Sequence, residues 1–234
     1  VSKYRLGGVA QWTFGMEDMA ASQAIRSAAL AIAPDQVIST IESSTGSIES
    51  AATLEFGSIF GLKASFQLPD KLPISNLLVR IETKAANESQ WREIATSTTG
   101  ADGIIQVPLL LSKSSMIRAR TDATWERLES ISAEVSVVIT RRISVNAPVS
   151  AVRSQPLQIT GTLAPRQSGV PLQLLQQRAG KWIPVGSPVL TDLNGLFTIS
   201  TTVEQKGFAK YMVRVAKDAQ WNQADSEVFT VVIR

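Results

Sequence analysis

Cysteine and histidine are both absent from this sequence of 234 residues. Without cysteine there is no disulfide framework, no thiolate nucleophile and no cysteine-ligated metal site. Without histidine there is no Ser-His-Asp triad, no histidine-ligated zinc and no imidazole acid or base. Carboxylates, lysines, tyrosines and hydroxyls are the side chains left for chemistry, and we expect no metal site and no cofactor.

A basic cluster and a long apolar segment are also missing. The net charge is +3, and no run of Lys and Arg exceeds Arg141-Arg142, which argues against a nucleic-acid partner. Residues 19–33 are apolar on one side, but at about 15 residues they are shorter than the roughly 20 that span a bilayer. No signal-peptide pattern follows the basic start. We therefore predict no nucleic-acid partner and no membrane span.

Residues 1–36 show the pattern of one strand followed by one helix. Gly7–Phe14 is a short apolar run, and a helix is predicted from Met19 until Pro34 stops it. The expected apolar stripe of this helix consists of Ile25, Ala28, Ala29 and Ile32. Glu17 and Asp18 are adjacent carboxylates that could suggest acid/base chemistry, but capping of the helix by Asp18 is the favoured interpretation.

Residues 37–55 are predicted to be a linker. The stretch STIESSTGSIESAATLE, residues 39–55, is rich in Ser, Thr and Glu and has no sustained hydrophobic period. It predicts a boundary between the N-terminal piece and the rest of the chain.

The remainder repeats itself with a period of roughly 90–95 residues, which is the size of one β-sandwich domain. Five segments match in order: 62–68 with 157–163, 77–94 with 172–185, 97–111 with 189–203, 116–125 with 212–221, and 133–140 with 226–234. Apolar and polar residues alternate within the short strands, so one face is expected to pack and the other to meet water. The sequence predicts a mainly β fold with two tandem immunoglobulin-like sandwiches, at 56–142 and 143–234.

Four tryptophans occupy corresponding positions in the two repeats. Trp91 and Trp182 are expected in the sandwich cores. Trp125 and Trp221 each end a D-A-x-W sequence in a predicted loop, which makes them candidate exposed contacts for a ligand or partner. Packing of these two onto the end of the sandwich is the favoured alternative.

Two short patterns have ordinary structural interpretations. Arg118 and Arg214 match each other on a penultimate strand, where we expect a solvent-facing ladder with acidic neighbours and no anion site. Residues 101–103 and 192–195 carry Asp and Gly as a calcium loop would, but the twelfth position of an EF-hand loop starting at Asp192 is Val203. Asx-Gly between two strands predicts hairpin turns.

The second repeat resembles the bacterial Ig-like modules of secreted and surface proteins. The matching residues are ITGTL, GVPLQLLQQRAGKWIPVG, TDLNGLF and YMVRV. This resemblance implies a sandwich fold and an extracellular location, and it leaves the ligand open. The absence of cysteine suits such export but also fits the cytosol.

The N-terminal piece resembles the last strand and helix of family-18 glycoside hydrolases, the chitinase-like (β/α)₈ barrels that include the spore-germination type. The motif stands here as LGGVAQWTFGMED followed by MAASQAIRSAAL. The resemblance implies that Trp12 was the aromatic floor of a sugar subsite in the parent enzyme only, where a flat ring stacks on a pyranose; in this chain, without the rest of the cleft, we expect it to bind no sugar. The acidic D-x-x-D-x-D-x-E motif of that family is absent, so we expect no catalytic residue in this chain.

Together these observations predict the non-catalytic C-terminal part of a secreted or cell-surface, glycan-acting protein, truncated from a larger enzyme. Its Ig-like modules would serve as spacers or as weak attachments to cell-wall polysaccharide or peptidoglycan. One alternative is a working family-18-like hydrolase of N-acetylglucosamine-containing glycans, if the upstream barrel is present. The second alternative is a surface adhesin that binds protein through exposed strand edges.

Overall fold

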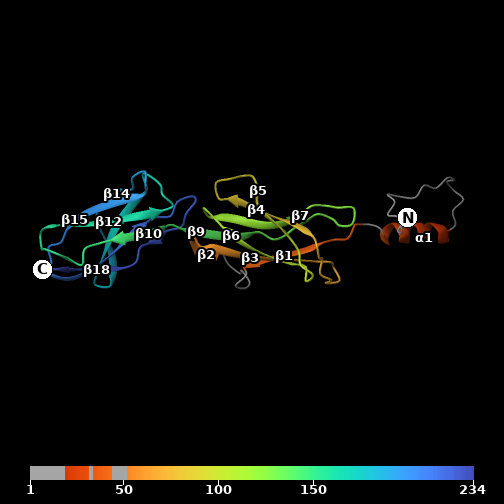
Figure 1. Ribbon diagram of the computed structural model, residues 1–234, viewed down its shortest axis with the longest axis horizontal. Helices are drawn as coiled ribbons and strands as arrows, with labels where there is room; N and C mark the ends of the chain where they lie inside the picture. The colour runs from red at the N-terminus through yellow and green to blue at the C-terminus, as the bar shows by residue number, and fades with distance from the viewer. Residues whose placement is uncertain (1–18, 32–33, 44–51) are drawn as a thin grey trace.

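The computed structural model describes residues 19–31, 34–43 and 52–234 of the chain. The fold is mainly β and consists of two sandwiches that lie end to end (Figure 1). We call the end of a sandwich at which its first strand begins its entry end, and the end at which its last strand stops its exit end. The exit end of sandwich 1 faces the entry end of sandwich 2.

Nine strands of sandwich 1 lie within the described residues. They are β1 (Ile38–Ser43), β2 (Ala52–Glu55), β3 (Ile59–Gln67), β4 (Leu78–Ala85), β5 (Arg92–Thr98), β6 (Ile104–Leu110), β7 (Ser115–Thr121), β8 (Ser130–Ile131) and β9 (Val135–Thr140). One sheet has the order β1-β3-β6 and the other β2-β9-β7-β4-β5, with β8 beside β7. All pairs are antiparallel except β2 with β9.

Sandwich 2 repeats this arrangement with nine strands of its own. They are β10 (Arg142–Asn146), β11 (Ser150–Ala151), β12 (Pro156–Ala164), β13 (Pro171–Arg178), β14 (Lys181–Leu190), β15 (Leu196–Thr202), β16 (Gly207–Val215), β17 (Ala224–Asp225) and β18 (Phe229–Ile233). The sheet orders β10-β12-β15 and β11-β18-β16-β13-β14 match those of sandwich 1 strand for strand. The repeated order is that of an immunoglobulin-like sandwich, which confirms the predicted fold class.

The sandwiches form because their strands alternate between apolar and polar residues. Along β3 every second side chain is buried, from Phe60 to Phe66, and the same alternation holds in β7 and β15. Each sandwich has its own apolar cluster between its two sheets. The hydrophobic period of two therefore determines which face of each strand enters the core.

The linker predicted over 37–55 is wrong at residues 38–43 and 52–55. Residues 38–43 form β1, which pairs with β3 from Ile38 opposite Gln67 to Ser43 opposite Leu62. Residues 52–55 form β2 beside β9. The Ser and Thr of β1 suit an edge strand, where Thr40 Oγ1 lies 2.6 Å from Ser65 Oγ. Sandwich 1 therefore begins at Ile38, earlier than predicted.

The helix α1 (Met19–Ala31) forms where the sequence predicts one and ends before Pro34. Its side chains from Met19 to Arg26 are all exposed, Ile25 among them. The predicted strand at Gly7–Phe14, with Trp12, lies outside the described residues, as do Glu17 and Asp18.

Both Asx-Gly patterns form turns, as predicted. Asp192 Oδ1 accepts hydrogen bonds from the N–H groups of Asn194 and Leu196, at 2.8 Å each. Asp102 Oδ1 accepts one from Ile104 N–H at 3.0 Å. Gly103 and Gly195 have φ values of 70° and 71°, a conformation that glycine adopts without strain. These carboxylates shape the backbone of their turns.

Candidate functional site: the joint between the two sandwiches

Trp221 of sandwich 2 is buried in the core of sandwich 1. It lies in the loop between β16 and β17, residues 216–223, and is 6% exposed. Its neighbours belong to the apolar cluster of sandwich 1, and its ring meets that of Phe56 edge to face with centroids 5.8 Å apart. The β16–β17 loop therefore closes the exit end of sandwich 1. We call the contact between this loop and that end the joint.

Arg141 is the single residue between β9 of sandwich 1 and β10 of sandwich 2. It is 3% exposed, and its guanidinium carbon lies 5.3 Å from the centroid of the Trp221 ring. Its Nη2 donates to Asp218 Oδ2 at 2.7 Å and to Gln167 Oε1 at 3.0 Å. One cation thus links two loops of sandwich 2 to the ring that fills sandwich 1.

Backbone hydrogen bonds fix the loop across the joint. Ser114 N–H donates to Gln220 O, and Asn222 N–H donates to Ile139 O, both at 3.0 Å. Within the loop, Asp218 Oδ1 accepts from the N–H groups of Gln220 at 2.8 Å and Trp221 at 3.0 Å. This turn presents the indole towards sandwich 1, because the carboxylate holds the backbone on both sides of Gln220.

The charge of Asp218 is stabilised within the joint. Burial acts to raise the pKa of its carboxyl, but hydrogen bonds from Gln220, Arg141 and Trp221 and the positive charge of Arg141 outweigh this effect and hold the pKa below its ordinary value. Asp218 therefore remains ionised at neutral pH and pairs with a cation that is almost fully buried.

A groove of about 710 Å³ runs along the side of the joint between β10 and the β17–β18 region. Glu55, Arg142 and Asp225 are among the side chains that line it, and Asp225 is held by both Nε and Nη2 of Arg214 on the neighbouring strand. The groove is open and its walls mix charges of both signs. The groove is therefore a space between the modules, and its lining residues form no cluster of reactive groups.

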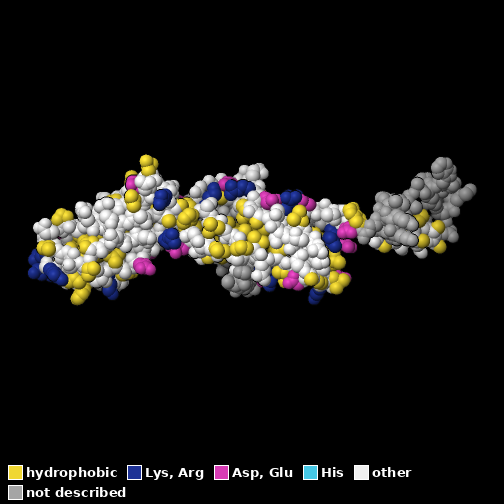
Figure 2. Space-filling view, viewed as in Figure 1, with side chains coloured by type: hydrophobic (Ala, Val, Ile, Leu, Met, Phe, Trp, Pro, Cys, Tyr) yellow, Lys and Arg dark blue, Asp and Glu magenta, His cyan; other side chains and the backbone are white. Residues whose placement is uncertain are grey.

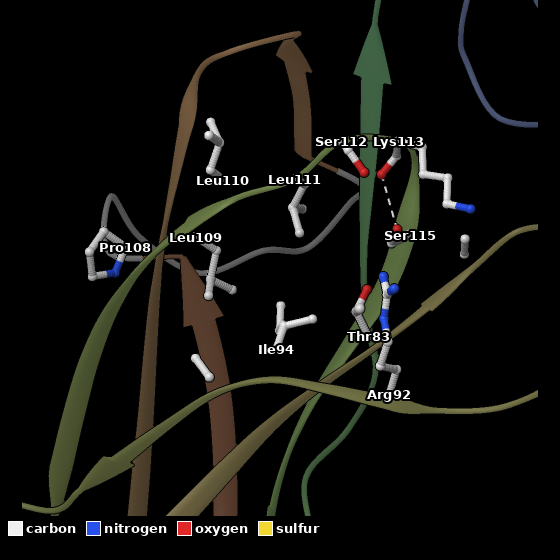
Figure 3. Close-up of a pocket in the computed structure, with 12 residues that line it drawn as sticks. Thr83, Arg92, Ile94, Pro108, Leu109, Leu110, Leu111, Ser112, Lys113 and Ser115 are labelled. Carbon is white, nitrogen blue, oxygen red and sulfur yellow. Dashed lines mark hydrogen bonds between the residues drawn. The ribbon is translucent and has the colours of Figure 1, made fainter.

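A smaller pocket of about 170 Å³ lies between β5 and β6, the edge strands of the two sheets of sandwich 1 (Figure 3). Its apolar wall comes from Ile94 and Leu109. The hydroxyl of Thr83 donates to Met116 O at 3.2 Å, and that of Ser115 donates to Lys113 O at 3.0 Å. These two hydroxyl groups are therefore already used within the sandwich.

The predicted contact residues have different surroundings in the structure. Trp125 is 61% exposed at the entry end of sandwich 1. The prediction of an exposed contact is wrong for Trp221, since it packs onto a sandwich end as the alternative expected, although that end belongs to the neighbouring module. Within the described residues no group of three or more Asp or Glu side chains could hold a metal ion.

Trp91 and Trp182 are half-buried and do not belong to the core clusters, so the core position predicted for them is wrong. Trp91 lies on the outer face of its sheet, where the guanidinium of Arg118 is 4.1 Å and the ammonium of Lys84 4.7 Å from its ring centroid. Both arginines have acidic neighbours as predicted, since Arg118 donates to Glu82 at 2.7 Å and Arg214 to Asp225 at 2.6 Å. The predicted solvent-facing position holds for Arg214 and is wrong for Arg118, because Glu82 is buried and the Arg118 guanidinium lies over the Trp91 ring.

Arg141 and Asp218 are the residues of the joint that sequence reasoning missed. The available signal was the spacing, because the apolar pattern of β9 runs to Ile139 and that of β10 begins at Ile143. No Gly- or Ser-rich stretch separates these two strands, so the connection is too short to act as a flexible linker.

No protein-family model matches the chain, and neither does any curated protein. The helix half of the family-18 resemblance forms α1 and does not by itself support that family, and the strand half, residues 6–18, lies outside the described residues. Among the part of the chain that is described, no helix is both long and apolar enough to cross a bilayer.

Several solved structures are similar to this chain at low identity. The C-terminal 282-residue fragment of intimin, solved with the intimin-binding domain of the translocated intimin receptor, has 16% identity and a TM-score of 0.38; the match covers 82% of this chain and 62% of that one. The D0–D1 domain of intimin has 13% identity and a TM-score of 0.32, covering 83% and 100%. Salmonella alpha-2-macroglobulin reacted with methylamine has 9% identity and a TM-score of 0.37, covering 86% and 16%. The chain thus spans less than two thirds of the intimin fragment, and its fold assignment rests on the strand order given above.

Proposed function

We propose that residues 34–234 form a rigid spacer in a cell-surface protein of the adhesin type. The observation that carries this proposal is the joint, in which Trp221 of one sandwich completes the core of the other. A spacer has to keep its two ends at a fixed distance and orientation. The buried Trp221 side chain resists bending between the sandwiches, because bending would expose the indole to water. Flexible chains do not need such a contact.

The short connection supports the same proposal. Arg141 alone separates β9 from β10, and its guanidinium is committed to Asp218 and Gln167 on two different loops of sandwich 2. Because the connection is one residue long and its side chain is held by sandwich 2, it leaves little slack for one module to rotate against the other. Domains joined by small polar contacts move freely by comparison.

A protein partner fits the surface better than a polysaccharide. Sugar binding uses exposed, flat aromatic faces, and Trp221 is unavailable for this. Trp125 and Phe208 are exposed, but they lie at opposite ends of the two-module unit and form no common platform. Charges of both signs mix along sandwich 1, so its visible face has no patch of one sign (Figure 2). For these reasons we do not adopt the polysaccharide and hydrolase interpretations, and Ig-like sheet edges such as β5 and β6 remain the surfaces for a protein partner.

The proposal is tested by incubating the full chain with insoluble peptidoglycan and with chitin. A spacer is expected to stay in the supernatant at all concentrations, with the unsubstituted chain and the Trp125→Ala variant behaving alike. Saturable binding to either polymer that Trp125→Ala removes would contradict the spacer proposal and assign a wall-attachment role to the entry end of sandwich 1.

A further inference from the structure

The loop between β7 and β8 of sandwich 1, residues 122–129, has the same backbone frame as the β16–β17 loop that forms the joint. Thr124 Oγ1 accepts from the N–H groups of Glu126 and Arg127, as Asp218 Oδ1 accepts from those of Gln220 and Trp221. Thr124 N–H donates to Arg127 O at 2.8 Å, as Asp218 N–H donates to Trp221 O at 2.9 Å. Thr124 is therefore the structural counterpart of Asp218.

The chain that enters each sandwich runs along this loop in the same way. Leu128 N–H donates to Asp35 O at 2.9 Å, as Asn222 N–H donates to Ile139 O at 3.0 Å. Counting on from Asp35 and Ile139 makes Val37 the counterpart of Arg141, and the two are 6% and 3% exposed. The entry end of sandwich 1 thus has the same loop hydrogen bonds as the entry end of sandwich 2, and the latter contacts a neighbouring module.

We infer that the entry end of sandwich 1 is a second joint, whose occupant is the N-terminal segment of this chain that carries α1. Apolar side chains gather at this end: Trp125 is 61%, Leu72 57% and Leu128 48% exposed. Two exposed apolar surfaces, this end and the α1 face with Ile25, are connected by a short segment around Pro34. In Figure 1, α1 lies beyond this end of sandwich 1.

The side chains at this end indicate that the occupant differs from a sandwich. The counterpart of Trp221 is Arg127, and the tryptophan stands two residues earlier, at Trp125. Arg127 Nε is buried without a hydrogen-bond partner among the described residues, as Arg141 Nε is at the filled joint, so both ends contain a buried guanidinium group. A helix docking beside an indole and a guanidinium fits this arrangement, whereas the exit end of a sandwich receives an indole into its core.

The absence of cysteine permits a direct test on the full chain, because two introduced cysteines carry the only spin labels. Ser27→Cys places one label on α1, and Gln106→Cys places the other on the exposed face of β6. A docked segment gives one narrow distance distribution by electron double resonance. Trp125→Ala and Leu128→Ala are each expected to broaden it, while Trp125→Phe keeps it narrow. Val149→Ala, which truncates an exposed apolar residue on sandwich 2, is the matched control and leaves it unchanged.

A broad distribution in the unsubstituted background, or a narrow one that survives Trp125→Ala and Leu128→Ala, would overturn the inference. Because Trp125 is exposed, circular dichroism is expected to show that Trp125→Ala folds normally. This inference goes beyond the proposed spacer function. The two labels measure the distance between α1 and sandwich 1. The docking of α1 can therefore be disproved while the spacer proposal stands, and the spacer proposal can be disproved while α1 docks.

Discussion

At the scale of single residues, Trp221 carries the contact between the modules. It belongs by sequence to sandwich 2 and by burial to sandwich 1, where it meets Phe56. Arg141, the residue that connects the two sandwiches, places its guanidinium over the Trp221 ring. Asp218 shapes the loop and neutralises the charge of Arg141. Three side chains thus supply an apolar plug, a cation and a counter-charge that depend on one another.

Trp221→Ala is expected to destabilise sandwich 1 although the substitution lies in sandwich 2. Removal of a buried tryptophan costs about 3–5 kcal/mol where the site does not collapse. Hydrogen exchange of core amides such as those of Leu62 and Ile117 is the measurement, since both residues are fully buried in sandwich 1. Val149→Ala, which truncates an exposed side chain of sandwich 2, is the control and should change the free energy of unfolding by no more than about 0.5 kcal/mol. Faster exchange confined to sandwich 2 would contradict this assignment.

The joint is expected to weaken in acid. The pKa of Asp218 is lowered in the folded chain, so its stabilising contribution is complete above the ordinary pKa of about 3.9 and is lost as the pH falls through the lower folded value. The carboxyl carbon of Asp218, followed by NMR, should therefore titrate below 3.9. Asp218→Asn should remove this pH dependence of joint stability. A titration at or above the ordinary value would show that the Arg141 pair does not stabilise the carboxylate.

At the scale of elements, the sequence predicted most of the fold because strand alternation and Asx-Gly turns are local signals. The Asp102 and Asp192 turns form as expected, and the two repeats give the same sheet order. β1 was missed because its inner face carries Ser39 and Ser43 beside Ile41 and so shows no apolar run, and its pairing with β3 is a tertiary feature.

The alignment of the repeats was also shifted by two residues in one region. The D-A-x-W match pairs Arg118 with Arg214, whereas the hydrogen bonds pair Arg120 with Arg214: Ser132 Oγ accepts from Ala119 N–H as Ser226 Oγ accepts from Val213 N–H. A short sequence identity in a loop cannot determine register, since the backbone turn at Thr124 or Asp218 does so. The joint itself could not be predicted, because it depends on how the sandwiches meet in space.

At the scale of the whole molecule, the two sandwiches form one elongated body with different ends (Figure 1). The exit end of sandwich 1 is completed by Trp221, and its entry end presents Trp125 and Leu128 on a similar frame. When a loop side chain of each module is buried in the core of the next, the row of modules stays straight and of constant length even though each interface is small. This arrangement is what a spacer requires.

The central claim is that the two sandwiches move as one body, and electron double resonance across the joint tests it most directly. Labels at Gln106→Cys on sandwich 1 and Ser200→Cys on sandwich 2 are both exposed and lie in strands. We expect one narrow distance distribution that broadens in Trp221→Ala and in Arg141→Ala and is unchanged in Trp125→Ala. A broad distribution in the unsubstituted background would show that the two sandwiches move independently and do not form a rigid unit.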